Sequence, residues 1–218
     1  METVWIIGGG RFGLRAVKYL LKQDKAFQVV LVDQDQKKLD QARELDCMTE
    51  LADGIAYLNT HLKSGNLPDW IVPALPVHLA WEWCRMQLGQ EVLIPLDISS
   101  KIDGLLPNPM RGPEGNIYVS HADFICPAHC NEPHDTCTVT QQPQKLEMFK
   151  LLSQLRFKDF SSLVIQSHQL GPGVGGYGPG ALFSLIERIE VQKDPFLLST
   201  ACRCHAVITG FKMNSVFR

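Results

Sequence analysis

The sequence lacks the long apolar runs that a membrane protein needs. No stretch approaches the ~20 consecutive apolar residues that cross a bilayer. The N-terminus, which begins Met-Glu-Thr, has neither the basic segment nor the small-residue cleavage site of a signal peptide. We therefore expect a cytoplasmic protein that does not span the membrane.

Clusters of basic residues are also absent. The 218 residues include 21 Lys and Arg against 23 Asp and Glu, and these charges are spread evenly along the chain. Because nucleic-acid-binding domains concentrate Lys and Arg on one face, nucleic acid is not expected as a partner. Internal repeats and low-complexity tracts are missing as well. The 45% hydrophobic and 20% charged residues are typical of a soluble globular protein.

The hydrophobic periodicity of the first hundred residues predicts strands that alternate with helices. We expect strands at residues 3–7, 27–32, 70–75 and 91–96, with a further short strand within 46–52. We expect a helix that follows the glycine-rich segment 8–13 and runs to about residue 23, and then helices at 35–45, 55–63 and 77–88. This alternation predicts a parallel sheet that is covered by helices on both faces.

A glycine motif joins the first of these strands to the first helix. The segment Gly8-Gly9-Gly10-Arg11-Phe12-Gly13 fits G-x-G-x-x-G, and Asp33 ends the next strand 20 positions after Gly13. In dinucleotide-binding turns, the first glycine permits the tight turn, the second lets the backbone approach the pyrophosphate, and the third lets the helix pack on the strand. The amides at the helix N-terminus then bind the phosphates.

This pattern predicts that the six-residue turn, including Arg11 and Phe12, binds a dinucleotide. A carboxylate at Asp33 would accept the ribose hydroxyls and repel a 2′-phosphate, which favours NAD(H) over NADP(H). The alternative is a glycine-rich turn that binds nothing.

The stretch WIIGGGRFGLRAVKYL…VVLVDQDQKKL resembles the nucleotide-binding domains of Trk-type potassium-uptake regulators. It is also similar to other NAD-binding Rossmann families, including the N-terminal domain of precorrin-2 dehydrogenases. The resemblance covers about residues 3–39 and implies that Gly8, Gly10, Gly13 and Asp33 contact the nucleotide.

The chain as a whole is predicted to be α/β, with an N-terminal Rossmann-like parallel sheet and a C-terminal α/β region that carries a Cys-rich loop. Residues 100–116 contain little periodicity and many Pro and Gly, so we interpret them as a linker between a dinucleotide-binding domain at 1–99 and a Cys/His-rich domain at 117–218. In the second domain we expect strands at 117–124, 161–167 and 196–200, and helices at 145–155 and 179–189.

Five of the seven cysteines fall in two short groups rich in histidine. The first group is His121-x4-Cys126-Pro-x-His129-Cys130-x3-His134-x2-Cys137, and the second is Cys202-x-Cys204-His205. Thiolates at such spacing can bind one soft ion, so we predict zinc or an iron–sulfur cluster on Cys126, Cys130 and Cys137, with Cys202 or Cys204 as the fourth ligand. Free thiols, a metal bound by the first group alone, and a redox disulfide such as Cys126–Cys130 remain alternatives.

Two further features could contribute to a site. His78, Asp97 and His168 each follow a predicted strand, at the edge where α/β sheets bind ligands, and we select them as candidate catalytic residues. For each alone, a capping or loop-stabilising role is the alternative. The segment LGPGVGGYGPG at residues 170–180 could wrap an anion, and the alternative is a flexible lid or a tight surface loop. It lacks the Lys-Ser/Thr of a P-loop, which disfavours triphosphate hydrolysis.

These features favour an NAD(H)-binding redox enzyme or electron-transfer protein with a zinc or iron–sulfur site. A regulatory module that senses NAD(H) or metal without catalysis is the second hypothesis. A tetrapyrrole dehydrogenase or metal chelatase is the third, because precorrin-2 dehydrogenases carry an acid placed similarly to Asp97. The expected partner is a small-molecule substrate or a redox partner protein, and a homodimer is left open.

Overall fold

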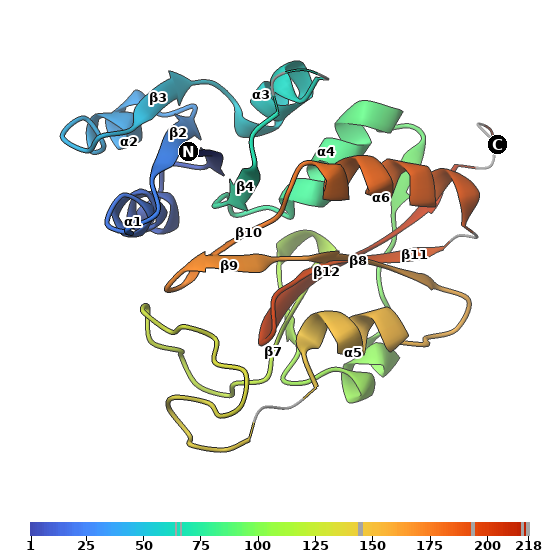
Figure 1. The fold of residues 1–218 in the computed structure, drawn as a ribbon. Coiled ribbons are helices and arrows are strands. Elements are labelled where there is room, and N and C mark those ends of the chain that lie inside the picture. Colours follow the sequence, from blue (N-terminus) through green and yellow to red (C-terminus); the bar gives the residue numbers. More distant parts are fainter. Residues whose placement is uncertain (64, 66, 144–145, 193–194, 215, 217–218) are drawn as a thin grey trace.

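The computed structural model describes residues 1–63, 65, 67–143, 146–192, 195–214 and 216, which form two large sheets and a two-stranded hairpin (Figure 1). The strands are β1 Glu2–Ile7, β2 Phe27–Asp33, β3 Met48–Leu51, β4 Trp70–Pro73, β5 Leu93–Pro95, β6 Met110–Arg111, β7 Ile117–Ser120, β8 Ser161–Gln166, β9 His168–Gly171, β10 Val174–Gly176, β11 Phe196–Ala201 and β12 His205–Met213. The helices are α1 Arg11–Leu20, α2 Gln36–Asp40, α3 Gly54–His61, α4 Leu79–Leu88, α5 Met148–Gln154 and α6 Gly180–Val191, with 3-10 turns at η1 Ser100–Leu105 and η2 Pro113–Gly115. In this described part of the chain, every helix is too short or too polar to cross a membrane.

The first sheet is parallel and has the strand order β3-β2-β1-β4. Its central strands are buried on both faces, as the continuous apolar run of β2 predicts for a parallel sheet. Helices α1 and α2 pack on one face, and α3 packs on the other. The structure therefore confirms the α/β class and the N-terminal parallel sheet.

The second sheet is mixed, with the order β6-β7-β12-β11-β8 and with β5 paired to the C-terminal end of β12. Strands β8 and β11 are parallel, and the remaining pairs are antiparallel. Helices α5 and α6 lie on opposite faces of this sheet (Figure 1). Helix α5 begins at Met148, whereas Lys145, where the sequence predicted its start, lies outside the described residues.

The segment between the two sheets differs from the sequence expectation. Strand β5 was expected in the parallel sheet but pairs antiparallel with β12. Residues 100–116, interpreted as a linker, contain η1 and β6. They pack on the second core through Ile102 and Leu106, which are buried there together with the preceding Ile98. These apolar residues recur every four positions. Because of this spacing the segment packs on the core, although its Pro and Gly content suggested a linker.

One apolar core extends across both sheets. It includes Ile7 and Val32 of the first sheet, Phe196 and Phe211 of the second, and Trp83 of α4, which lies between them. Burying an aliphatic or Phe side chain of this kind contributes about 1.5–3 kcal/mol. The shared core therefore fixes the position of one sheet relative to the other.

The glycine-rich stretch at 170–180 is a hairpin of β9 and β10 rather than an open loop. After β10 the chain pairs with β4, because the Ile71 amide donates to Tyr177 O (2.8 Å) and the Tyr177 amide donates to Ile71 O (3.0 Å). The side chain of Gln23, just after α1, donates to Leu170 O (2.7 Å). The hairpin thus covers part of the free edge of β4, which would otherwise expose unpaired backbone groups.

Candidate functional site

Two adjoining cavities form a continuous cleft between the sheets. The larger measures about 1200 Å³ and the smaller about 460 Å³. Both are lined by Arg11 and Phe12 of α1, Tyr118 of β7, Thr200 of β11 and the glycine hairpin. The smaller cavity reaches the glycine turn after β1, and the larger contains the cysteine and histidine groups. The cleft therefore connects the predicted nucleotide site with the predicted metal site.

Each glycine of the turn has a different structural role. Gly8 has φ +113°, and a Cβ there would lie 2.6 Å from Ala74 O. A Cβ at Gly13 would overlap the carbonyl oxygen of Gly8. At Gly10, by contrast, a Cβ would meet nothing within 4 Å. Folding thus requires Gly8 and Gly13, whereas Gly10 leaves open the space that a pyrophosphate occupies in turns of this kind.

Asp33 is buried at the end of β2, with 3% of its surface exposed. Burial would raise the pKa of this carboxyl, but three donors lower it below its usual value. Oδ2 accepts from the Gly9 amide (2.7 Å), Oδ1 accepts from the Asp35 amide (2.8 Å), and Lys38 Nζ lies 3.3 Å from Oδ2. Asp33 is therefore a fixed negative charge beside the glycine turn.

Two arginine side chains add positive charge near the N-terminus of α1, where they line the cleft. The guanidinium carbons of Arg11 and Arg15 lie 5.2 and 4.9 Å from the ring centroid of Phe12, which is 55% exposed. Arg15 Nε is buried and has no hydrogen-bond partner in the described part of the chain. The first turn of α1 holds no acidic residue. The sequence prediction omitted Arg15, although its spacing of one turn from Arg11 could have indicated it.

The two cysteine groups meet in the larger cavity, which all five predicted cysteines line. Cys126, Cys130 and Cys137 lie on the long segment between β7 and α5, whereas Cys202 and Cys204 lie in the turn between β11 and β12. The segment is held to the rest of the structure by its backbone. The His121 amide donates to Cys204 O (2.9 Å), and the side chain of Gln169 donates to Cys130 O (2.7 Å). The ligand set itself stays a prediction.

The thiols of this cluster have different electrostatic surroundings. Burial, followed by the negative charges of Glu132 and the neighbouring thiolates, raises the pKa of Cys204 to about 12. Burial likewise raises the pKa of Cys126 and of Cys202. The pKa of Cys137 is lowered instead, because the backbone amide and hydroxyl of Thr140 and the amide of Val139 donate to its sulfur. The protein therefore stabilises the thiolate form of Cys137 more than that of the other three.

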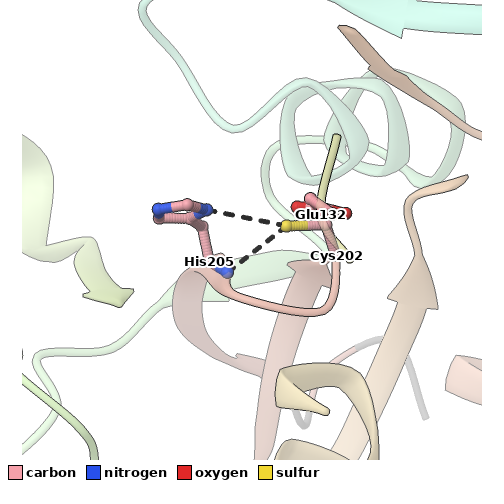
Figure 2. A group of neighbouring side chains, drawn as sticks. All are labelled: Glu132, Cys202 and His205. Atoms are coloured by element: carbon pink, nitrogen blue, oxygen red, sulfur yellow. Dashed lines mark hydrogen bonds between the residues drawn. The ribbon is translucent and has the colours of Figure 1, made fainter. Parts of the chain in front are cut away.

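Three different donors converge at the turn between β11 and β12 (Figure 2). One ligand atom from each of Glu132, Cys202 and His205 lies within 4.8 Å of the other two. Among the described residues, this is the group whose geometry fits a metal ion. His205 belongs to a motif that the sequence singled out, but it was not selected as a ligand. Glu132 was missed, although it lies between two selected cysteines.

The three candidate catalytic residues are not brought together by the cleft. His78 is 3% exposed, and its ring bonds to Thr209 Oγ1 (2.8 Å) and Thr200 Oγ1 (2.9 Å). Thr209 donates its hydroxyl proton to Asn116, so it accepts from Nδ1–H of His78, and Nε2 accepts from Thr200. Burial lowers the pKa of His78 to about 3, which leaves it neutral at physiological pH. His78 therefore anchors the start of α4 to the second sheet.

Asp97 and His168 are exposed and lie outside the linings of both cavities. His168 makes an edge contact with Trp70, at a centroid distance of 5.7 Å. Asp97 Oδ1 lies beside Gly115, the last residue of η2. A catalytic role for either residue stays a prediction.

Comparison with known proteins supports the N-terminal assignment. Residues 4–57 match the TrkA-N domain, and residues 80–214 match a family described as "Uncharacterized protein, C-terminal domain". A protein of Archaeoglobus fulgidus named "Uncharacterized protein" is 30% identical over 223 residues, which cover 95% of this chain and 98% of the relative. No solved structure matches the chain significantly. The TrkA-N match confirms the resemblance to Trk-type regulators and the Rossmann-like fold of the N-terminal part.

Replacing Gly10 with valine should abolish NAD(H) binding while the protein stays folded, because the side chain would fill the open space above the turn. Isothermal titration calorimetry measures binding, and circular dichroism checks the fold. Gly180→Val is the matched control, since Gly180 also begins a helix and faces open space. Normal binding by Gly10→Val would show that the turn has only a structural role.

The buried His78 should make stability depend on pH. Its pKa is about 3 in the folded protein and about 6.5 in the unfolded chain, so the unfolded state binds one more proton between these values. The free energy of unfolding should therefore fall as the pH drops from 6.5 towards 3, by up to about 1.4 kcal/mol per pH unit.

Urea titrations of the wild type and His78→Gln at several pH values would measure this slope. The variant should lack the contribution of His78, whereas His168→Gln, at an exposed position, should keep the wild-type slope. Equal slopes for the wild type and His78→Gln would contradict the assignment of a buried neutral imidazole.

Proposed function

The chain belongs to the family described as "Uncharacterized protein, C-terminal domain", and we propose that this member is an NAD(H)-dependent redox protein whose reaction takes place in the cleft between the two sheets. The observation that carries the proposal is the continuity of the cleft from the glycine turn to the thiol-rich cluster. Binding of NAD(H) alone would require only the first of these two ends.

The residues at the first end fit a dinucleotide. TrkA-N domains typically bind NAD(H), and the match covers the glycine turn and Asp33. The open space at Gly10, the free amides at the start of α1 and the guanidinium groups of Arg11 and Arg15 suit a pyrophosphate. The fixed charge of Asp33 suits ribose hydroxyls. Bound NAD(H) would supply a hydride donor or acceptor to this cleft.

The residues at the other end are suited to redox or metal chemistry. Five thiols share one cavity with Glu132 and His205. These thiols are partly buried and face one cavity, an arrangement that suits metal binding or a redox role. A small-molecule substrate could enter the larger cavity, whose volume of about 1200 Å³ is above the ~300–1,000 Å³ of typical ligand pockets. A redox partner protein is the other expected partner.

A regulatory module that senses NAD(H) is the second candidate. The observation that favours it is the TrkA-N match, because this domain resembles those of potassium-uptake regulators. Both candidates require dinucleotide binding, and they differ in whether hydride leaves the cofactor. Asp97, on which the tetrapyrrole alternative rested, lies outside the lining of the cleft, so the structure adds no support to that alternative.

Asp33→Asn should narrow the difference in affinity between NADH and NADPH. The amide keeps the size of the carboxylate and one acceptor for the Gly9 amide, but it removes the charge that repels a 2′-phosphate. Calorimetric titration with both nucleotides measures the ratio of their dissociation constants. Asp69→Asn is the control, because Asp69 accepts the Thr3 amide at the opposite edge of the sheet. Tighter binding of NADPH than NADH by the wild type would remove the proposed preference.

Anaerobically purified protein should oxidise NADH when a two-electron acceptor such as an aldehyde or a quinone is present, so that the hydride passes to the acceptor and NAD+ is released. We expect Gly10→Val to lose this activity together with NADH binding, and Cys202→Ser to lose activity while NADH still binds. Cys47→Ser is the control, since Cys47 lies just before β3 and outside the cavity linings. Tight NADH binding without oxidation by any of a series of acceptors would favour the sensor instead.

A further inference from the structure

The turn between β11 and β12 brings together three kinds of metal ligand without the need for a conformational change. Cys202 and His205 flank this turn, and Glu132 reaches it from the long segment after β7 (Figure 2). Cys202 Sγ lies 3.8 Å from His205 Nδ1. In a tetrahedral zinc site, bonds of ~2.3 Å to sulfur and ~2.0 Å to nitrogen place these two atoms ~3.5 Å apart.

We propose that Glu132, Cys202 and His205 bind one Zn²⁺ ion, with the fourth position open to the cleft and Cys126 orienting the imidazole. The inference deepens the proposed function because it assigns the metal end of the same cleft. It replaces the four-thiolate set expected from the sequence with one thiolate, one imidazole and one carboxylate.

The backbone of the turn donates a hydrogen bond to the sulfur of Cys202. The amide of His205 donates to Cys202 Sγ at 3.3 Å, and the amide of Cys202 donates to His205 O at 3.0 Å. An N–H that points at the sulfur stabilises its negative charge. On binding, Zn²⁺ replaces the proton of the Cys202 thiol, and that proton is released to solvent.

The second nitrogen of His205 has its own partner. Cys126 Sγ lies 3.7 Å from Nε2, on the side of the ring away from Nδ1. Metal-bound histidines commonly donate their other N–H to an acceptor that fixes the ring and the tautomer. This position makes Cys126 a positioning residue and leaves Nδ1 for the metal.

Glu132 supplies the third ligand from a constrained backbone. Its φ is +44°, in the left-handed region that residues other than glycine seldom adopt. Such outliers are retained where the surrounding structure requires them, often at functional sites. One carboxylate and one thiolate also balance the charge of a divalent ion.

The donor set distinguishes zinc from an iron–sulfur cluster. Zinc accepts sulfur, nitrogen and oxygen ligands in one tetrahedron, whereas iron–sulfur clusters are usually held by four thiolates. Sites with three protein ligands and one open position bind water or substrate at zinc. The three residues all line the larger cavity, so the open position would face the space shared with the nucleotide site.

The test is zinc analysis and X-ray absorption of the full chain, purified without oxygen and loaded with one equivalent of Zn²⁺. We expect one zinc per chain, with a single sulfur neighbour at ~2.3 Å and the other neighbours at ~2.0–2.2 Å. Cys202→Ser, His205→Gln and Glu132→Gln should each lose stoichiometric zinc. Cys126→Ser should weaken zinc binding about 10- to 100-fold, as the loss of an orienting partner does.

Cys130→Ser and Cys137→Ser are the matched controls, because both thiols line the same cavity but belong to the four-thiolate alternative. Both should retain zinc. Four sulfur neighbours, loss of zinc in Cys137→Ser, or absence of bound zinc in the wild type would each overturn the proposal, as would a brown protein that absorbs near 400 nm. NADH titration of every variant reports separately on the proposed function and on folding.

Discussion

The pairing of Ile71 with Tyr177 is the contact on which the arrangement of the cleft depends. These two backbone hydrogen bonds attach the chain after β10 to the edge of the first sheet, although the residues are more than a hundred positions apart. The same glycine hairpin holds the long cysteine-containing segment, because the Gly173 amide and the Gln169 side chain both donate to Cys130 O. One hairpin thus positions the nucleotide-binding part, the second sheet and the cysteine cluster relative to one another.

The parts of the fold that the sequence predicted are those that local patterns determine. The order strand, glycine turn, helix, strand and acid in the first 33 residues is a local signal, and the structure has these elements at the expected positions. Strands β5 and β12 depend on pairing between residues more than a hundred positions apart. Hydrophobic periodicity detects β5 as a strand but carries no information on its partner, so the sequence assigned it to the wrong sheet.

The candidate site shows the same division. Clustering in the sequence predicted that the two cysteine groups act together, and the structure places all five thiols in one cavity. Which atoms converge depends on the turn between β11 and β12 and on the backbone of Glu132, neither of which spacing alone reveals. The position of His78 after a strand suggested catalysis. The sequence could not predict its hydrogen bonds to Thr200 and Thr209, because both threonines lie over 120 positions away.

The N-terminal sheet stops after four strands, and this limit has a chemical consequence. A complete dinucleotide-binding fold has the strand order 3-2-1-4-5-6, so its own second half borders the crevice beside the first strand. Here the order ends at β4, and β5 pairs with β12 instead. Tyr118 and Thr200 of the second sheet and the glycine hairpin line the crevice in place of that half. In the proposed function, the first sheet would therefore determine which nucleotide binds, whereas the second sheet and its cysteine-containing segment would determine which chemistry the bound nucleotide meets.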